Sequence, residues 1–280
     1  MNKIMKNLML VVGMLCIICL SCANAENQDE QTDSIVTNVQ EKPQNLVKQL
    51  LINDDDWQKR VVDFEYDESG RLVEVSMTYN AGAKSEFTEK ATVTYGKSTI
   101  VCEGPKEKLT LTLDSDGFVK KRERITEDTV TVAAYEYNSG RLSACGDAEC
   151  GNKYLWDGDN IAKMTVVLCE DDGNWYDTIE YKYSDVARPN IDVLAFSDMF
   201  GGFPNAESVA SKGLVSKYMP SEIKGSNYNS DGAMTRVLLL THKYTTDDAG
   251  RITDIEYYRY SFDIASKLKE ETDKAVKVVD

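Results

Sequence analysis

Few residues of this sequence have the types and spacing needed for acid–base or nucleophilic chemistry. The one histidine, His242, follows an apolar run, Val237 to Leu240, and no Gly-x-Ser-x-Gly elbow lies near it. A Ser-His-Asp triad needs such a nucleophile held beside its base. We therefore interpret His242 as a structural strand residue and predict no catalytic residue.

Neighbouring acidic residues are common, but they fall in expected turns, at Asp54 to Asp56, Asp171 to Asp172 and Asp247 to Asp248. Acidic residues in turns hydrogen-bond to their own backbone. Nothing in the sequence places two of them across a cleft as a glycosidase requires. The runs 114–117 and 157–160 also lack the spacing of a calcium loop. The sequence thus predicts no enzyme activity, no metal site and no cofactor.

Four cysteines, Cys102, Cys145, Cys150 and Cys169, would reach an oxidising compartment if the chain is exported. Cys145 and Cys150 flank a short loop, so they could face each other across a hairpin and form a disulfide. Cys102 would then pair with Cys169. The alternative is that all four remain thiols. A zinc site is not expected, because there is a single histidine and no pair of CxxC motifs.

Aromatic residues on expected strands are the best candidates for ligand contact. Trp57, Trp156 and Trp175 are the three tryptophans, and several tyrosines lie near them in the sequence. Flat rings on a sheet could stack on a glycan or line a groove for an apolar ligand. The alternative is cross-strand pairing that only stabilises the sheet.

A repeated hairpin pattern predicts the elements that carry these residues. In Phe64 to Leu72 an aromatic strand runs into Asp-Glu-Ser-Gly and a second strand leaves on Arg-Leu. Related hairpins span residues 135–142 and 243–252, with the glycine at 70, 140 and 250. Their unequal spacing excludes a solenoid or propeller. We predict an all-β fold, an antiparallel meander curled into a barrel-like or half-barrel sheet.

The expected organisation is a single β domain over 46–262 and a C-terminal tail over 263–280. Glycine and proline concentrate in an irregular insert at 184–234, which is either a functional loop or a plug for an open end of the sheet. Charges such as Arg60, Lys120 and Lys182 interrupt the strands without leaving a lipid-facing set. A membrane-spanning barrel is therefore not expected.

The N-terminus has the proportions of a signal peptide over residues 1–21, with Lys3 and Lys6 before an apolar run from Leu8 to Leu20. Leu-Ser-Cys22 resembles the end of a bacterial lipobox, which predicts lipidation of Cys22. Cleavage after Ala25 is the alternative. Residues 22–45 are polar and acidic and are expected to form a flexible tether.

The formal net charge of −15 argues against a nucleic-acid partner, because phosphates require a basic surface. It equally disfavours electrostatic docking on anionic lipids. Membrane association is therefore expected through the lipid on Cys22.

The hairpins resemble the YD-type repeats of secreted bacterial proteins. Over residues 46–260 the chain resembles a Bacteroides-type family of secreted lipoproteins of unknown function with a porin-like fold. Residues 61–73, 156–161 and 181–185, and the segment from Met199 to Pro220, carry that resemblance. It implies a curved antiparallel sheet in an outer-membrane lipoprotein, on its periplasmic or cell-surface side, and it transfers no functional residue. The expected function is a non-catalytic envelope lipoprotein that binds a glycan or apolar ligand; the alternative is a structural or partner-binding envelope protein.

Overall fold

The computed structural model describes residues 46–53, 59–146, 150–170, 173–191, 193–194, 204–229, 231–267 and 269–279. Most of them belong to sixteen strands. These are β1 (Gln49–Asn53), β2 (Arg60–Tyr66), β3 (Leu72–Tyr79), β4 (Phe87–Tyr95), β5 (Thr99–Glu103), β6 (Glu107–Leu113), β7 (Val119–Thr126), β8 (Val130–Asn138), β9 (Arg141–Gly146), β10 (Gly151–Asp157), β11 (Asn160–Glu170), β12 (Gly173–Ala187), β13 (Tyr218–Tyr228), β14 (Met234–Thr246), β15 (Ile252–Asp263) and β16 (Lys269–Val279). One short helix, α3 (Ala206–Val209), lies between β12 and β13. The described part of the chain has no helix long and apolar enough to cross a membrane.

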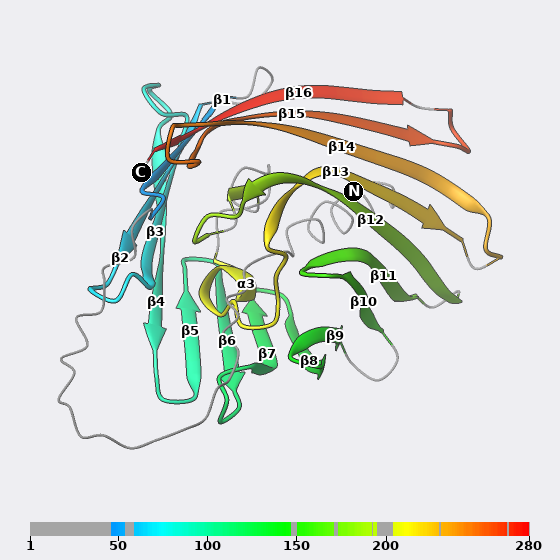
Figure 1. Ribbon diagram of the computed structural model, residues 1–280, viewed down its shortest axis with the longest axis horizontal. Helices are drawn as coiled ribbons and strands as arrows, with labels where there is room; N and C mark the ends of the chain where they lie inside the picture. Colours follow the sequence, from blue (N-terminus) through cyan, green and yellow to red (C-terminus); the bar gives the residue numbers. More distant parts are fainter. Residues whose placement is uncertain are drawn as a thin grey trace.

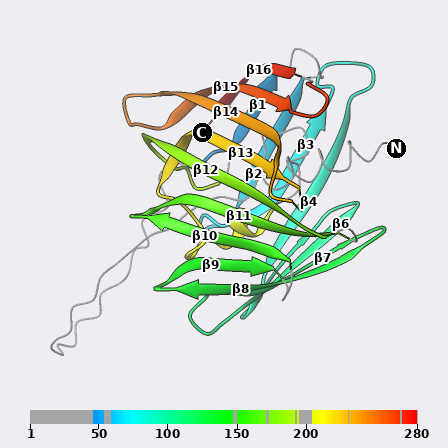
Figure 2. The same cartoon turned by 90° about the vertical axis from the view of Figure 1, so that its right-hand side faces the viewer.

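The strands form one closed antiparallel barrel in which each strand pairs with its neighbours in the sequence (Figure 1). Figure 2 shows β8 to β12 stacked in chain order along one side. This confirms the predicted all-β meander and shows that the sheet is a closed barrel, not a half-barrel.

The last strand corrects the expected tail at 263–280, because β16 closes the barrel against β1. Gln49 pairs with Val279 and Asn53 with Ala275. Val276 and Val278 are buried with 2% and 5% of their surface exposed, while Lys277 between them is exposed. This period of two is that of a strand with one face on a core. The segment forms a strand and not a tail, because β1 and β15 would otherwise each have an open edge.

Side chains alternate between an apolar interior and a polar exterior along most strands. On β3, Val75 and Met77 are buried, whereas Glu74 and Ser76 between them are only partly covered. Buried apolar residues from nearly all strands form one contiguous core. Burial of this inner surface is the main force that holds the meander closed.

The repeated turns all lie at one end of the barrel, which we call the first end; β1 begins there and β16 ends there. In the first turn Asp67 Oδ1 accepts hydrogen bonds from the backbone N–H groups of Ser69 and Arg71, both at 2.9 Å. Gly70 has φ +76°, as the turn requires. Asp247, Gly250 and Arg251 repeat this geometry. The hairpin pattern thus encodes a turn whose aspartate caps the loop.

The strands differ in length, so the opposite end, the far end, is uneven. Strands β1 to β10 have 5 to 9 residues, whereas β11 to β16 have 11 to 15. Figure 1 shows β13 to β16 running well past the ends of the shorter strands. The far end therefore has a projecting wall on one side only.

Candidate functional site

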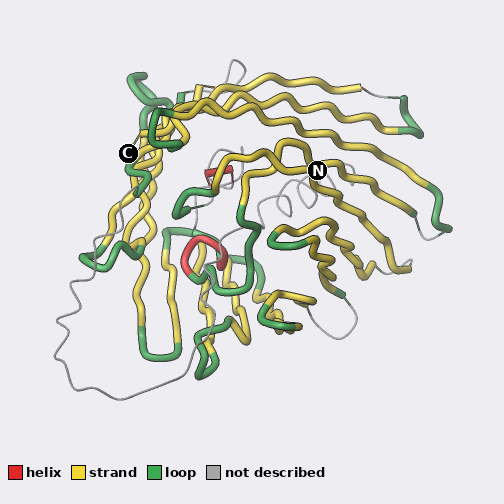
Figure 3. Tube along the Cα trace, in the orientation of Figure 1, coloured by secondary structure: helices red, strands yellow, loops and turns green. Residues whose placement is uncertain are grey.

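The described residues of the connection between β12 and β13 pack inside the barrel and fill part of it. Strand β12 extends to Ala187 and β13 begins at Tyr218, so the irregular insert expected at 184–234 narrows to 188–217. We call the described residues of this connection, 188–191, 193–194 and 204–217, the plug. Its residues Ile191, Leu214 and Val215 are at most 2% exposed and belong to the same core as the strands. Figures 1 and 3 show α3 within the ring of strands.

A closed ring of hydrogen bonds attaches the plug to the wall. The hydroxyl of Ser216, which is fully buried, accepts from the backbone N–H of Ile161 at 2.9 Å. It donates to the Tyr183 hydroxyl at 2.7 Å, which in turn donates to the carbonyl of Ile161 at 2.7 Å. Each polar atom is satisfied, so the plug is held without the penalty of an unpaired buried group.

A second attachment brings two backbones together at the first end. The N–H of Leu142 donates to the carbonyl of Gly213 at 2.8 Å. A Cβ atom at Gly213 would lie 2.5 Å from the carbonyl oxygen of Gly140 and 2.9 Å from the ring of Phe118. The ammonium of Lys212 lies 4.4 Å above the same ring. Only glycine fits at 213, and the plug is seated tightly against the wall there.

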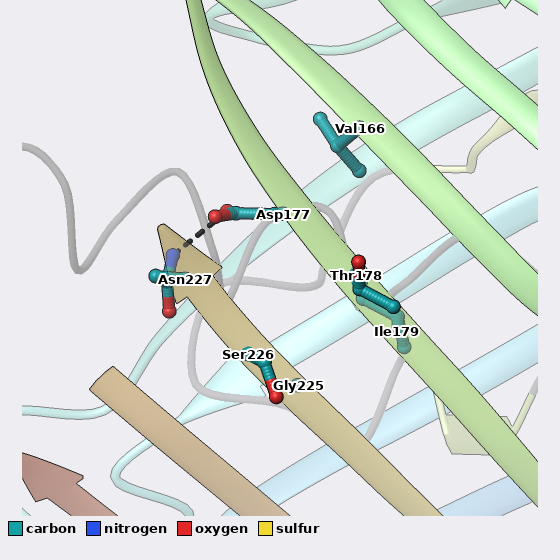
Figure 4. A pocket seen from close by; sticks show the side chains of 7 residues that line it. All are labelled: Val166, Asp177, Thr178, Ile179, Gly225, Ser226 and Asn227. Atoms are coloured by element: carbon teal, nitrogen blue, oxygen red, sulfur yellow. Dashed lines mark hydrogen bonds between the residues drawn. The ribbon is translucent and has the colours of Figure 1, made fainter. Parts of the chain in front are cut away.

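A small pocket lies on the inner side of the wall between β12 and β13 (Figure 4). Its lining residues are Val166, Asp177, Thr178, Ile179, Gly225, Ser226 and Asn227, and its empty volume, including the part open to solvent, is about 230 Å³. Sites for drug-sized ligands measure about 300–1,000 Å³. This pocket is too small to enclose a glycan chain.

The pocket contains a buried carboxylate, that of Asp177. Asp177 is 6% exposed, and its Oδ2 accepts a hydrogen bond from the Asn227 amide at 2.8 Å (Figure 4). Burial raises the pKa of Asp177 to about 6, and the bond from Asn227 only partly offsets that effect. Asp177 is therefore protonated more readily than an ordinary aspartate.

Polar residues continue from this pair across the inner face of the long strands. Asn227 pairs with Arg236 in the β13–β14 ladder. The Arg236 guanidinium donates to the hydroxyl of Ser261 at 2.8 Å and lies 3.7 Å from the carboxylate of Glu270. The interior therefore changes from apolar to polar toward the far end.

His242 is packed between two tyrosines. Its ring centroid lies 6.2 Å from that of Tyr244 and 5.8 Å from that of Tyr257, both nearly parallel to it. Its Nδ1 atom is buried without a hydrogen-bond partner, and burial lowers the pKa of His242 to about 4. His242 thus lies on β14, as expected, and burial keeps its ring neutral.

Asp177 and His242 are expected to give opposite pH dependences of stability. Folding raises the pKa of Asp177 from 3.8 to about 6, so this group lowers the free energy of unfolding as pH rises through that window. Folding lowers the pKa of His242 from 6.5 to about 4, so stability is lost as pH falls through that range. Each effect is about 2–3 kcal/mol, and the two nearly cancel in the wild type.

Removing either group should make the pH dependence due to the other group measurable. For Asp177→Asn we expect the free energy of unfolding to rise by about 2–3 kcal/mol between roughly pH 4 and 6.5, and for His242→Phe to fall by a similar amount. Urea unfolding across this pH range measures both, and each variant is the control for the other. Equal slopes in the two variants would contradict the assigned burial of these groups.

The outer face is polar over most of the barrel. Outward ladder pairs include Ser76 with Lys90 and Lys163 with Glu180, and Lys182 forms a 2.8 Å ion pair with Glu222. A membrane-spanning barrel has the opposite arrangement, with an apolar outer band about 25 Å tall. At these pairs on β3, β4, β11, β12 and β13 the outer face is thus polar.

The outer face departs from this pattern on β7 and β8, where Ile125, Val130 and Val132 are exposed, and also on β14 and β15. Val237 pairs with Phe262, Leu239 with Tyr260 and Thr241 with Tyr258. Their inward neighbours Leu238 and Ser261 are both 2% exposed, so the alternation of a strand directs these pairs outward. We call Val237, Leu239, Tyr258, Tyr260 and Phe262 the outer stripe.

Of the three tryptophans expected to contact a ligand, only Trp156 has a described side chain, and that side chain contacts β9. Its indole N–H donates to the carbonyl of Leu142 at 2.8 Å, and the guanidinium of Arg141 lies 5.5 Å from the ring centroid. The Trp156 side chain thus links β9 to β10 at a position beyond the backbone hydrogen bonds that pair these two strands. Trp57 lies outside the described residues, and Trp175 is placed only as a backbone position in β12, opposite Leu168.

The cysteine pairs expected from the sequence are not formed. Cys102 and Cys145 are both buried and neither is in a disulfide, whereas Cys150 is disulfide-bonded. The β9–β10 register explains the error: Gly146 pairs with Gly151 and Cys145 with Asn152, so Cys145 and Cys150 are not opposite each other. The Cys145 sulfur lies 3.5 Å from the Tyr154 hydroxyl, and burial raises the pKa of Cys102 to about 12.

The described residues contain no group of three or more His, Cys, Asp and Glu side chains arranged to hold a metal ion. Residues 54–56 and 171–172, where acidic turns were expected, lie outside the described part, as does Cys22.

The sequence did not reveal the outer stripe, the buried Asp177 or the close packing of Gly213 against Gly140 and Phe118. For the stripe a signal existed: the uninterrupted run Val237 to Leu240 and the tyrosines at 257, 258 and 260 lack the alternation of a half-buried strand. Such a run predicts a strand covered on both faces. Asp177 and Gly213 carry no local signal, because their roles depend on residues far away in the chain.

Comparison with solved structures finds the same architecture in two porin-like proteins. The proteins from Bacteroides uniformis and Bacteroides vulgatus are each 14% identical to this chain, with TM-scores of 0.57. The aligned regions cover 85% and 84% of this chain and 98% of each of those chains. No family model matches the sequence, and no curated protein does. At this identity the likeness establishes the shared porin-like barrel fold.

Proposed function

We propose that this chain is a non-catalytic, membrane-anchored protein of the cell envelope that acts by binding another macromolecule through its outer surface. The observation that carries the proposal is the contrast between an interior partly filled by the plug and a partly apolar exterior. A channel needs an open lumen and a carrier needs a roomy cavity. Here the described residues of the plug pack in the core of the barrel, and attachments at Ser216 and Gly213 hold them there.

A glycan or apolar ligand inside the barrel has less support. The pocket beside Asp177 is small, and Trp156, the candidate whose side chain is described, is engaged in joining two strands. The partner-binding alternative uses a surface that is available, namely the outer stripe. We therefore favour it over ligand binding on the curved sheet.

The anchor in this proposal is a lipid on Cys22. Residues 22–45 number 24, and an extended chain of that length reaches about 80 Å. The chain enters the barrel at the first end, where the N–H of Val47 donates to Asn190 Oδ1 at 3.0 Å and the Tyr66 hydroxyl donates to the carbonyl of Val47 at 2.6 Å. A firmly attached barrel on a long tether can meet a partner while its lipid stays in the outer membrane.

The test is crosslinking in whole cells that export the full chain, comparing the wild type with Cys22→Ser. For the wild type we expect acyl labelling, recovery in the membrane fraction and crosslinks to an envelope macromolecule. Cys22→Ser should lose the acyl label and leave the membrane fraction, because removing the acyl chains removes about 0.8 kcal/mol per buried CH₂ group. An unlabelled wild-type chain would contradict the anchor, and a labelled chain without crosslinks would contradict partner binding.

A further inference from the structure

The pocket between β12 and β13 combines one buried carboxylate with apolar walls. In the ladders, Asp177 pairs with Val166 and with Asn227. Figure 4 shows Asp177 and Asn227 together at one side of the pocket. Val166 and Ile179 lie at the other side, and Gly225, which also lines the pocket, adds no side chain. The pocket thus offers a negative charge on one side and hydrocarbon on the other.

One oxygen of the carboxylate is available to a ligand. Asp177 Oδ2 accepts the 2.8 Å hydrogen bond from Asn227, whereas Oδ1 accepts no hydrogen bond from any described residue. None of the described residues forms an ion pair with Asp177, which is 6% exposed. A buried carboxylate in this state has lost most of its hydration without full compensation. A ligand that brings a positive charge and an N–H donor to Oδ1 would offset that loss.

The charged group nearest to this pair along the β13–β14 ladder has partners of its own. Arg236 pairs with Asn227 in that ladder. Its guanidinium donates to the hydroxyl of Ser261 at 2.8 Å and lies 3.7 Å from the carboxylate of Glu270. The two ladder partners of Asp177 itself are uncharged. The positive charge that would balance Asp177 is therefore one that a ligand can supply.

We propose that this pocket is a binding site for a small primary amine in its ammonium form, with the nitrogen at Asp177 Oδ1 and a short alkyl chain against Val166 and Ile179. The empty volume of about 230 Å³, part of it open to solvent, suits a ligand smaller than a drug-sized molecule. An ammonium is a compact charge with three donors. One of them can bond to Oδ1 while the others keep water in the open part of the pocket. The site is separate from the outer surface on which the proposed function depends.

The single available oxygen argues against two other kinds of cation. A guanidinium typically binds a carboxylate through two parallel N–H bonds, and Asn227 already occupies one of the two oxygens. Calcium takes about six to eight oxygen ligands, whereas the described residues include no group of three side chains arranged to hold a metal ion. An ammonium group needs neither arrangement.

Equilibrium dialysis of the full chain in a non-ionic detergent against radiolabelled n-butylamine tests the site. At about pH 7.5 we expect saturable binding of one equivalent. Asp177→Asn should raise the dissociation constant about 30-fold or more, because it removes one member of a buried charge pair. The matched control is Glu180→Gln, which removes a charge from an exposed position of β12 that pairs with Lys163. It should leave binding unchanged.

Gly225→Ala tests the pocket without altering the carboxylate. An added Cβ would lie 3.4 Å from the Cβ atom of Leu238, a contact that the strand can accept, and the methyl group would take up space in the pocket. We expect the dissociation constant to rise about 10-fold, the usual effect of one methyl group in a small site. Circular dichroism confirms that each variant is folded.

Protons should compete with the amine for Asp177. Burial raises the pKa of this carboxyl to about 6, so at about pH 5 most molecules carry it protonated and uncharged. We expect the dissociation constant of n-butylamine to be about 10-fold higher at about pH 5 than at about pH 7.5. The Asp177→Asn variant should lose this dependence, and Glu180→Gln should keep it.

A wild type without saturable binding at about pH 7.5 would overturn the proposal, as would a folded Asp177→Asn variant that binds like the wild type. 1-Butanol, potassium chloride and methylguanidinium chloride are the competitors. Displacement of the amine by an equal concentration of 1-butanol would mean that only the alkyl chain is recognised. Equal displacement by potassium or by methylguanidinium would mean that the pocket does not select an ammonium group. Each of these three results would overturn the assigned ligand.

Discussion

Truncation of the chain after Lys267 is expected to abolish the cooperative unfolding of the barrel. The deletion removes β16, which forms nine ladder pairs with β15 and five with β1. It also removes the buried side chains of Val276 and Val278, each worth about 1.5–3 kcal/mol when fully buried. With the open edges included, the loss is about 5 kcal/mol or more, comparable with the whole stability of a domain. Urea unfolding followed by circular dichroism and fluorescence measures it.

The control is deletion of Asp280 alone, which leaves all of β16 in place. We expect that variant to unfold like the wild type. A truncated chain that still unfolds in one sharp transition at a similar urea concentration would show that β16 is not needed to close the barrel. It would support instead the tail that the sequence suggested.

Gly213→Ala is expected to lower the free energy of unfolding by about 2–4 kcal/mol. The residue has φ +73°, which costs an alanine about 1 kcal/mol. The new Cβ would also lie 2.5 Å from the carbonyl oxygen of Gly140, and relieving such overpacking typically costs about 1–3 kcal/mol. Both the plug segment and the β8–β9 turn would have to shift. Thermal unfolding should show a decrease in Tm of about 5–15 °C.

Gly250→Ala is a matched control for this substitution. Gly250 has φ +76°, lies at the same end of the barrel and has no neighbour within 4 Å of an added Cβ. It therefore carries the conformational penalty without the clash, and we expect a loss of about 1 kcal/mol. Equal losses in the two variants would mean that the plug is not seated against the wall at Gly140.

Together these experiments separate the two structural requirements of the proposed function. Closure by β16 makes the wall continuous, and the contact at Gly213 keeps the plug inside it. The proposed function requires both properties, because in it a partner binds the outer surface of the barrel.

Local patterns in the sequence were sufficient for the strands and their turns. Alternation in Leu72 to Tyr79 reports one covered face, and each Asp-to-Gly-Arg turn is stabilised by bonds within five residues. Such interactions depend only on neighbours in the chain, so they can be recognised without the fold. The all-β meander and its hairpins followed from them directly.

Only the tertiary structure decided the register, the closure and the polarity of the two faces. In the β9–β10 ladder Gly146 pairs with Gly151, so Cys145 lies opposite Asn152 and not opposite Cys150. Strand β16 forms because it supplies the hydrogen-bonding partner of β1, which lies more than 200 residues earlier in the chain. Asp177 and the outer stripe acquire their character from which face of a curved wall each residue occupies. These features arise from contacts between distant segments, and their energies appear only when the barrel is complete.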